Sequence, residues 1–129
     1  MDVLSSRILL HPADPARSQR FYRDTLGLAV AREFGDPAAP GLVFFLGGGG
    51  LLEVSGTGDG AGFGDGALWL QVRDVDAEHT RLAALGVTVR RAPVTEPWGL
   101  RECWIADPDG VRIVLVEIPA DHPIRRDTR

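Results

Sequence analysis

Several residue types are scarce or missing in this chain of 129 residues, and each absence excludes a kind of chemistry. The chain has no lysine, so all 14 of its basic residues are arginine. This excludes lysine Schiff-base chemistry and a phosphate-binding loop that depends on lysine. A single cysteine, Cys103, allows neither an internal disulfide nor a zinc site made of thiolates. We therefore expect packing alone to hold the fold together.

Long apolar runs and excess positive charge are also missing. No run approaches the roughly 18 apolar residues that cross a bilayer, and polar residues interrupt the first ten positions, where a secretory signal needs an apolar stretch. We therefore expect a cytoplasmic protein with no membrane partner. The net charge of −4 argues against nucleic acid as a partner, because phosphate binding needs clustered positive charge.

What the chain does contain is one pattern that occurs twice, at an offset of about 59 residues. Each half has an apolar run, a segment that ends in Leu-Gly, and two further apolar runs separated by a turn. The pattern predicts a βαβββ unit in each half, within a single domain. The expected parts are modules at about 5–56 and 66–118, a glycine-rich linker at 56–66 and a tail at 120–129.

Local signals place a helix in each half. Asp14 followed by Pro15 is typical of a helix start, and Gly27 and Gly86 stand where a left-handed helix end favours glycine. In the second half, a stripe at helical spacing is expected to face a sheet. The stripe consists of Val75, His79, Leu82 and Leu85. The segment 107–110 predicts a tight turn between two strands.

Three stretches in this arrangement resemble the vicinal oxygen chelate superfamily, which includes glyoxalase I, extradiol dioxygenases and bleomycin-resistance proteins. They are FYRDTLGL (21–28), LLEV (51–54) and EPWGLRECWIADPDGVRIVLVE (96–117). The resemblance implies an α+β fold of two tandem βαβββ modules, whose curved mixed sheets enclose a cavity. It also implies a homodimer, although pairing of the two halves within one chain is equally consistent with the repeat.

The resemblance also indicates where a metal ion would be held in the enzymes of the superfamily. Those positions lie on the first and last strands of each module and correspond here to Arg7, Glu53, Ala67 and Val114. Of these, only Glu53 can coordinate a metal ion, and catalytic zinc typically needs three protein ligands. The chain is therefore expected to have no metal and no cofactor, as in the bleomycin-resistance branch.

Alternation along the strands indicates which side chains face the cavity, because neighbouring residues point to opposite faces. The helix-facing positions are aliphatic, and the cavity-facing positions mix polar and aromatic residues, as a binding pocket requires. The orientation of Trp104 is left open. The predicted ligand-binding residues are Arg7, His11, Glu53, Trp69, Gln71, Trp98 and Arg112.

We further predict an ion pair between Arg7 and Glu53 in place of the metal. If the first and fourth strands are neighbours, as the resemblance implies, the guanidinium can reach the carboxylate. We expect the pair to be buried, so removal of one partner should cost roughly 3–5 kcal/mol.

Four functions are compatible with these residues. The first is metal-independent binding of a small aromatic or amphipathic molecule. The second is a metal-dependent lyase or dioxygenase whose ligands include His11 and Glu53, and the third is a metal-free enzyme with either residue as its acid or base. The fourth is a structural or partner-binding module. It is disfavoured because the polar and aromatic residues converge on one sheet face rather than forming an exposed apolar patch.

Overall fold

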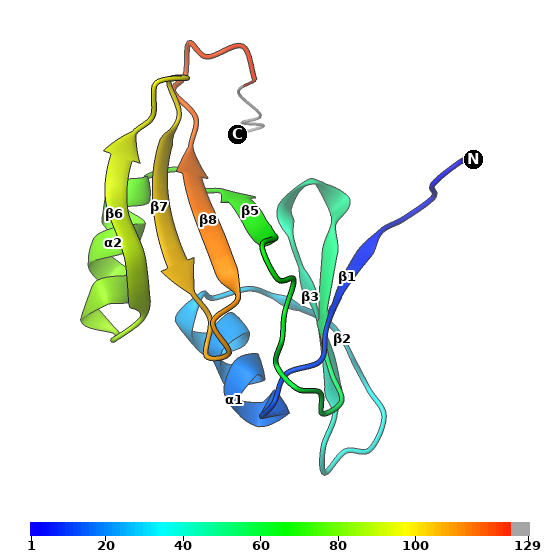
Figure 1. The fold of residues 1–129 in the computed structure, drawn as a ribbon. Helices are drawn as coiled ribbons and strands as arrows, with labels where there is room; N and C mark the ends of the chain where they lie inside the picture. Colours follow the sequence, from blue (N-terminus) through cyan, green and yellow to red (C-terminus); the bar gives the residue numbers. More distant parts are fainter. Residues whose placement is uncertain (125–129) are drawn as a thin grey trace. The chain divides into compact units, whose positions relative to one another are not determined.

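The computed structural model describes residues 1–124 and has an α+β fold with two four-stranded mixed sheets (Figure 1). The first half contains β1 (Arg7–Leu10), α1 (Pro15–Arg20), a π-helical turn η1 (Phe21–Thr25), β2 (Val30–Phe34), β3 (Gly41–Phe45), a short 3-10 turn η2 (Gly47–Gly49) and β4 (Leu51–Val54). The second half contains β5 (Ala67–Gln71), α2 (Val75–Ala84), β6 (Thr88–Thr95), β7 (Arg101–Ala106) and β8 (Arg112–Glu117). The predicted βαβββ order is confirmed in both halves. Residues 125–129 of the predicted tail lie outside the described residues.

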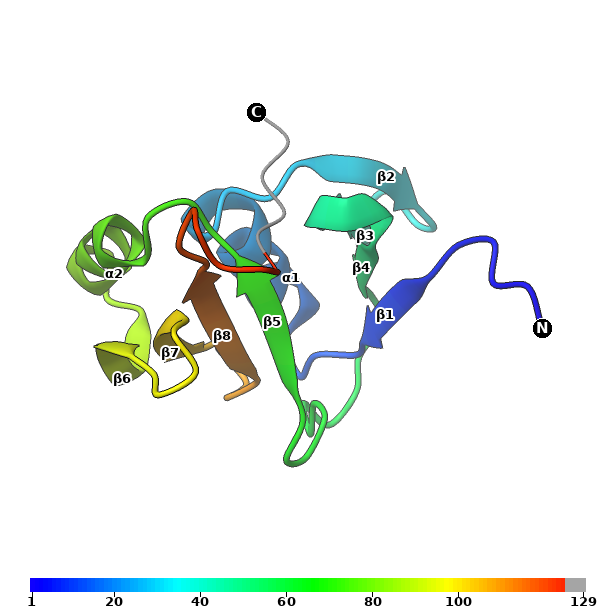
Figure 2. The same cartoon turned by 90° about the horizontal axis from the view of Figure 1, so that it is seen from above.

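The two sheets repeat one topology. The strand order is β1-β4-β3-β2 in the first sheet and β5-β8-β7-β6 in the second, as Figure 2 shows from above. In each sheet the first and last strands of the half run parallel as neighbours, and the other pairs are antiparallel. The first strand of each half therefore lies beside the last, which places the two predicted metal positions of each half on adjacent strands.

Both helices begin directly after a capping aspartate. The side chain of Asp14 accepts a hydrogen bond from the backbone of Arg17 at 3.2 Å, and the side chain of Asp74 caps α2 in the same way at 2.9 Å. The prediction that Leu85 faces a sheet was wrong, because α2 ends at Ala84 and Leu85 is 59% exposed at the helix end.

The chain divides into two compact units. Unit 1 comprises Met1–Asp65 together with Asp107–Val111, and unit 2 comprises Gly66–Ala106 together with the residues from Arg112 onward. The turn between β7 and β8 therefore belongs to unit 1, although both strands belong to unit 2. No helix of the described residues is long and apolar enough to cross a membrane.

In each unit one sheet face carries the core. In unit 1 the buried side chains of this face are Leu10, Leu42, Phe44, Leu52 and Val54, together with Phe21 and Tyr22 from the helical segment. In unit 2 they are Leu68, Cys103, Ile105, Ile113 and Leu115, together with Val75 and Leu82 from α2. The helix covers one face of each sheet, and the opposite face carries the predicted binding residues Arg7 and Glu53 in unit 1 and Trp69 and Arg112 in unit 2.

Candidate functional site

The open face of the unit 1 sheet carries the predicted ion pair. Nη1 of Arg7 lies 3.0 Å from Oε1 of Glu53, which confirms the predicted contact. The register explains this contact. Leu9 of β1 pairs with Glu53 of the parallel strand β4, and Arg7 precedes Leu9 by two residues, so its side chain points to the same face. The side chain of Arg7 is 38% exposed and that of Glu53 is 15% exposed. The pair is therefore partly solvated, and the energy expected for a buried pair does not apply.

Two further groups complete a row of polar contacts on this face. The hydroxyl of Ser55 donates a 2.6 Å hydrogen bond to Oε2 of Glu53. Nδ1 of His11 donates a 3.0 Å hydrogen bond to the carbonyl oxygen of Ser55. The Ser55 hydroxyl, and secondly Arg7, lower the pKa of the Glu53 carboxyl, while partial desolvation opposes them. Glu53 is therefore held as a carboxylate with both oxygens engaged.

This donor set does not fit the divalent metal of the superfamily. Glu53 is the only oxygen ligand among the four corresponding positions, and an arginine and a serine already contact its two oxygens. Ala67 and Val114 have no side-chain donor atoms for a metal. Hard divalent ions need several oxygen ligands, and a guanidinium beside the carboxylate repels a cation.

The open face of the unit 2 sheet carries aromatic and basic residues. The side chains of Ala67 and Trp69 pair in register with Arg112 and Val114 of β8, so all four point to the same face. Trp69 is 50% exposed, and Gln71 follows it on this face, half-buried. The structure therefore brings three of the predicted residues, Trp69, Gln71 and Arg112, onto one surface.

The orientation of Trp104, which the sequence leaves open, is fixed by the sheet. Trp104 pairs with Val114, so it shares the face of Trp69 with β8 between them. The guanidinium of Arg91 lies 3.8 Å from the centroid of the Trp104 ring system, a cation–π contact. The guanidinium of Arg112 lies 5.8 Å from the same centroid.

Arg91 belongs to a group that sequence reasoning missed. Its guanidinium contacts the carboxylate of Glu96 and lies 3.8 Å from that of Glu102, and Nε1 of Trp104 donates a 3.2 Å hydrogen bond to Glu102. The pairing of β6 with β7 shifts between Val89 and Arg91. This irregularity breaks the period-two alternation that identifies faces in a sequence.

The structure places Trp98 apart from the sheet faces. It lies in the turn between β6 and β7, where the amide of Gly99 donates to the carbonyl of Glu96 at 2.9 Å. Its side chain is 58% exposed, and its carbonyl oxygen accepts a 3.2 Å hydrogen bond from His122. A ligand contact by Trp98 stays a prediction.

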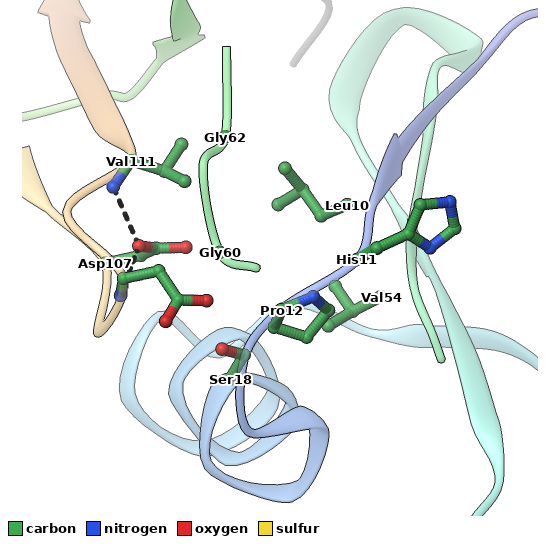
Figure 3. Close-up of a pocket in the computed structure, with 10 residues that line it drawn as sticks. Leu10, His11, Pro12, Ser18, Val54, Gly60, Gly62, Asp107 and Val111 are labelled. Atoms are coloured by element: carbon green, nitrogen blue, oxygen red, sulfur yellow. Dashed lines mark hydrogen bonds between the residues drawn. The ribbon is translucent and has the colours of Figure 1, made fainter. Parts of the chain in front are cut away.

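Unit 1 also contains a small pocket that the sequence did not predict (Figure 3). It is lined by Leu10, His11, Pro12, Ser18, Val54, Gly60, Gly62, Asp107, Asp109 and Val111. The hydroxyl of Ser18 is buried here without a hydrogen-bond partner. The cavity volume of about 10 Å³ is the size that holds one water molecule. The pocket is too small for an organic ligand.

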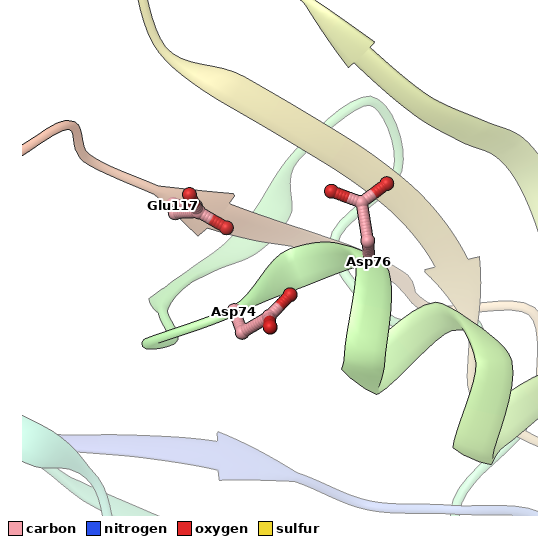
Figure 4. A group of neighbouring side chains, drawn as sticks. All are labelled: Asp74, Asp76 and Glu117. Carbon is pink, nitrogen blue, oxygen red and sulfur yellow. The ribbon is translucent and has the colours of Figure 1, made fainter.

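Three carboxylates gather at the start of α2: Asp74, Asp76 and Glu117 (Figure 4). Each has a structural role. Asp74 caps the helix, Glu117 accepts a 2.9 Å hydrogen bond from the backbone of Val75, and Asp76 binds Arg101 through two 2.8 Å contacts. Hydrogen bonding by Arg101 lowers the pKa of Asp76. The group is therefore explained by the helix start and an ion pair.

Comparison with known proteins agrees with this architecture. The model of the Glyoxalase/Bleomycin resistance protein/Dioxygenase superfamily matches residues 6–115. A superfamily member from Sphaerobacter thermophilus DSM 20745 is 27% identical, with a TM-score of 0.68, over 91% of this chain and 98% of that one. TnmS3, an antibiotic binding protein from Streptomyces sp. CB03234, is 26% identical, with a TM-score of 0.75, over 92% and 98%.

A third structure is similar in fold alone. A lactoylglutathione lyase from Agrobacterium tumefaciens is 22% identical, with a TM-score of 0.69, over 91% of this chain and 94% of that one. No curated protein matches the chain.

Proposed function

Because the chain belongs to the Glyoxalase/Bleomycin resistance protein/Dioxygenase superfamily, we propose that it binds a small aromatic or amphipathic molecule and uses no metal ion to do so. The observation that carries this proposal is the ion pair of Arg7 and Glu53. Arg7 engages the one carboxylate at the superfamily's metal positions, so we expect the ligand to be held by contacts with protein side chains and not by a metal ion.

The open face of unit 2 supports the choice of ligand. Trp69 is half exposed, and its flat aromatic surface favours stacking with a planar molecule. An antibiotic binding protein is among the similar structures, at 26% identity. Sequestration of a compound of this general kind is therefore the function we favour, in a cytoplasmic homodimer.

Catalysis by Glu53 is less well supported. A general base works best when its pKa lies near the operating pH, and the contacts of Glu53 lower its pKa instead. Both of its oxygens are also engaged. A metal-dependent lyase reaction lacks the ligand set that it needs.

Two measurements test the proposal. Elemental analysis of protein purified without a chelator should show no stoichiometric nickel, zinc, manganese or iron. A thermal-shift series of planar antibiotics, quinones and thiol adducts should contain compounds that raise the melting temperature, because a ligand that binds only the native state adds about 2.7 kcal/mol at a hundredfold excess over its Kd.

The variant Trp69→Ala tests the role of the indole. It should have the parent's melting temperature without ligand and should lose the rise in melting temperature that ligand causes in the parent. One metal ion per chain, with loss of binding after chelation, would overturn metal independence. If no compound in the series shifts the melting temperature, the binding function itself is wrong.

A further inference from the structure

We propose that the ligand is a planar aromatic anion, whose ring stacks on Trp69 and whose negatively charged group binds Arg112. This inference rests on the proposed function and specifies its ligand class. It is based on the open face of unit 2, where an exposed indole and an exposed guanidinium lie on neighbouring strands.

The register of the sheet places the two residues on the same face of neighbouring strands. Trp69 pairs with Val114, and Arg112 stands two residues before Val114 on the same strand and the same face. Trp69 and Arg112 are therefore diagonal neighbours across β5 and β8. Arg112 is flanked in register by Ala67 and Ala106, whose side chains are single methyl groups.

The other end of this face is more buried. Beyond Val114, it carries a buried apolar cluster beside the half-buried Gln71. The cluster consists of Leu100, Val116 and Ile118, with Val114 packed against them. The part of the face that is open to a ligand is thus the end that contains Trp69 and Arg112.

The two arginines of this face differ in their partners. Arg91 contacts Glu96 and lies 3.8 Å from Glu102, so its charge is balanced. Within residues 1–124, no carboxylate oxygen lies within 4.0 Å of the guanidinium of Arg112, whose neighbour is the Trp104 ring at 5.8 Å. Arg112 therefore offers a planar, permanently charged group with its hydrogen-bond donors available.

This charge distribution selects among aromatic ligands. A carboxylate or phenolate can accept hydrogen bonds from the guanidinium, and a carboxylate can do so in a two-point geometry. A cationic ligand would place like charge beside Arg112, and a neutral one would leave the guanidinium without a charged partner. Stacking on Trp69 does not depend on the charge of the ligand, so we expect Arg112 to discriminate between anionic, neutral and cationic aromatic ligands.

Three probes with one ring system and different charge test the inference: 2-naphthoate, 2-naphthamide and 2-naphthylmethylammonium. In isothermal titration calorimetry, naphthoate should bind about tenfold more tightly than naphthamide, the effect of about one charge-assisted hydrogen bond. The ammonium probe should bind more weakly than both. Raising the salt concentration should weaken naphthoate binding alone.

Variants assign the two roles. Arg112→Gln should reduce naphthoate affinity about tenfold and leave naphthamide affinity unchanged. The matched control Arg90→Gln removes the same charge from an exposed position on β6 and should change neither affinity. Trp69→Ala should weaken naphthoate and naphthamide equally.

Failure of the inference can be told apart from failure of the proposed function. Equal affinity for the three probes, or an unchanged naphthoate affinity in Arg112→Gln, overturns the anionic class while binding itself stands. If no naphthyl probe binds but other aromatic compounds raise the melting temperature, the inference is likewise overturned. If nothing in either series binds, both proposals are wrong.

Discussion

The hydroxyl of Tyr22 donates a 2.8 Å hydrogen bond to the carboxylate of Asp107, although the two residues are 85 positions apart in the chain. Both side chains are buried. The other oxygen of Asp107 accepts hydrogen bonds from the backbone amides of Asp109 and Val111. One carboxylate therefore fixes the turn between β7 and β8 and joins it to the helical segment of unit 1.

Removal of this hydroxyl should destabilise the protein. Tyr22→Phe leaves a buried carboxylate with one donor fewer, so the free energy of unfolding should fall by about 1–3 kcal/mol in a urea titration. Burial and the nearby Asp107 raise the pKa of Tyr22, so the phenol stays protonated and the loss should be the same at pH 7 and pH 9. An unchanged midpoint would contradict the role of this hydrogen bond.

The ion pair of Arg7 and Glu53 should contribute little to stability. Because Arg7 is more than a third exposed, a double-mutant cycle with Arg7→Ala and Glu53→Ala should give a coupling energy of about 0.5–1 kcal/mol. Chemical denaturation of the four proteins measures it. A coupling energy of several kcal/mol would mean that the pair is buried in solution, for example by a second copy of the chain.

The acid dependence of stability should contain a contribution from Glu53. Its pKa in the folded protein is lowered, chiefly by the hydroxyl of Ser55, so the contribution is fully present above the unfolded-state pKa of about 4.3 and is lost as the pH falls through the folded value. Ser55→Ala should raise the pKa of Glu53, as measured by carboxyl carbon NMR. Glu53→Gln should weaken the fall in stability below pH 4.3. If Ser55→Ala leaves the pKa where it was, the hydrogen bond does not form in solution.

Cys103 should be inert in the native protein. It is fully buried, and burial raises the pKa of its thiol, so little thiolate is available for reaction. A thiol reagent at pH 8 should label it only after addition of denaturant. Rapid labelling of the native protein would show that the helix-facing side of the unit 2 sheet opens readily.

Much of the fold follows from the sequence because its signals are local. The helix starts at Asp14 and Asp74 depend on the capping residue itself, and the contact of Arg7 with Glu53 follows from strand alternation once the strands are neighbours. The orientation of Trp104 could not be predicted in this way, because it depends on the register of β7 with β8.

Other parts of the site depend on distant or irregular features. The contact between Arg91 and Trp104 follows an irregularity in the pairing of β6, and the bond between Tyr22 and Asp107 joins residues with no shared local pattern. The module boundaries and the ligand roles of His11 and Gln71 stay predictions.

The assignment of Asp107–Val111 to unit 1 bears on how this chain can be divided. A fragment that stops at Asp65 would lose Asp107, the acceptor of the Tyr22 hydroxyl. The remaining fragment would keep the turn Asp107–Val111 without the rest of unit 1, to which this turn belongs. We therefore expect neither half to fold when expressed alone.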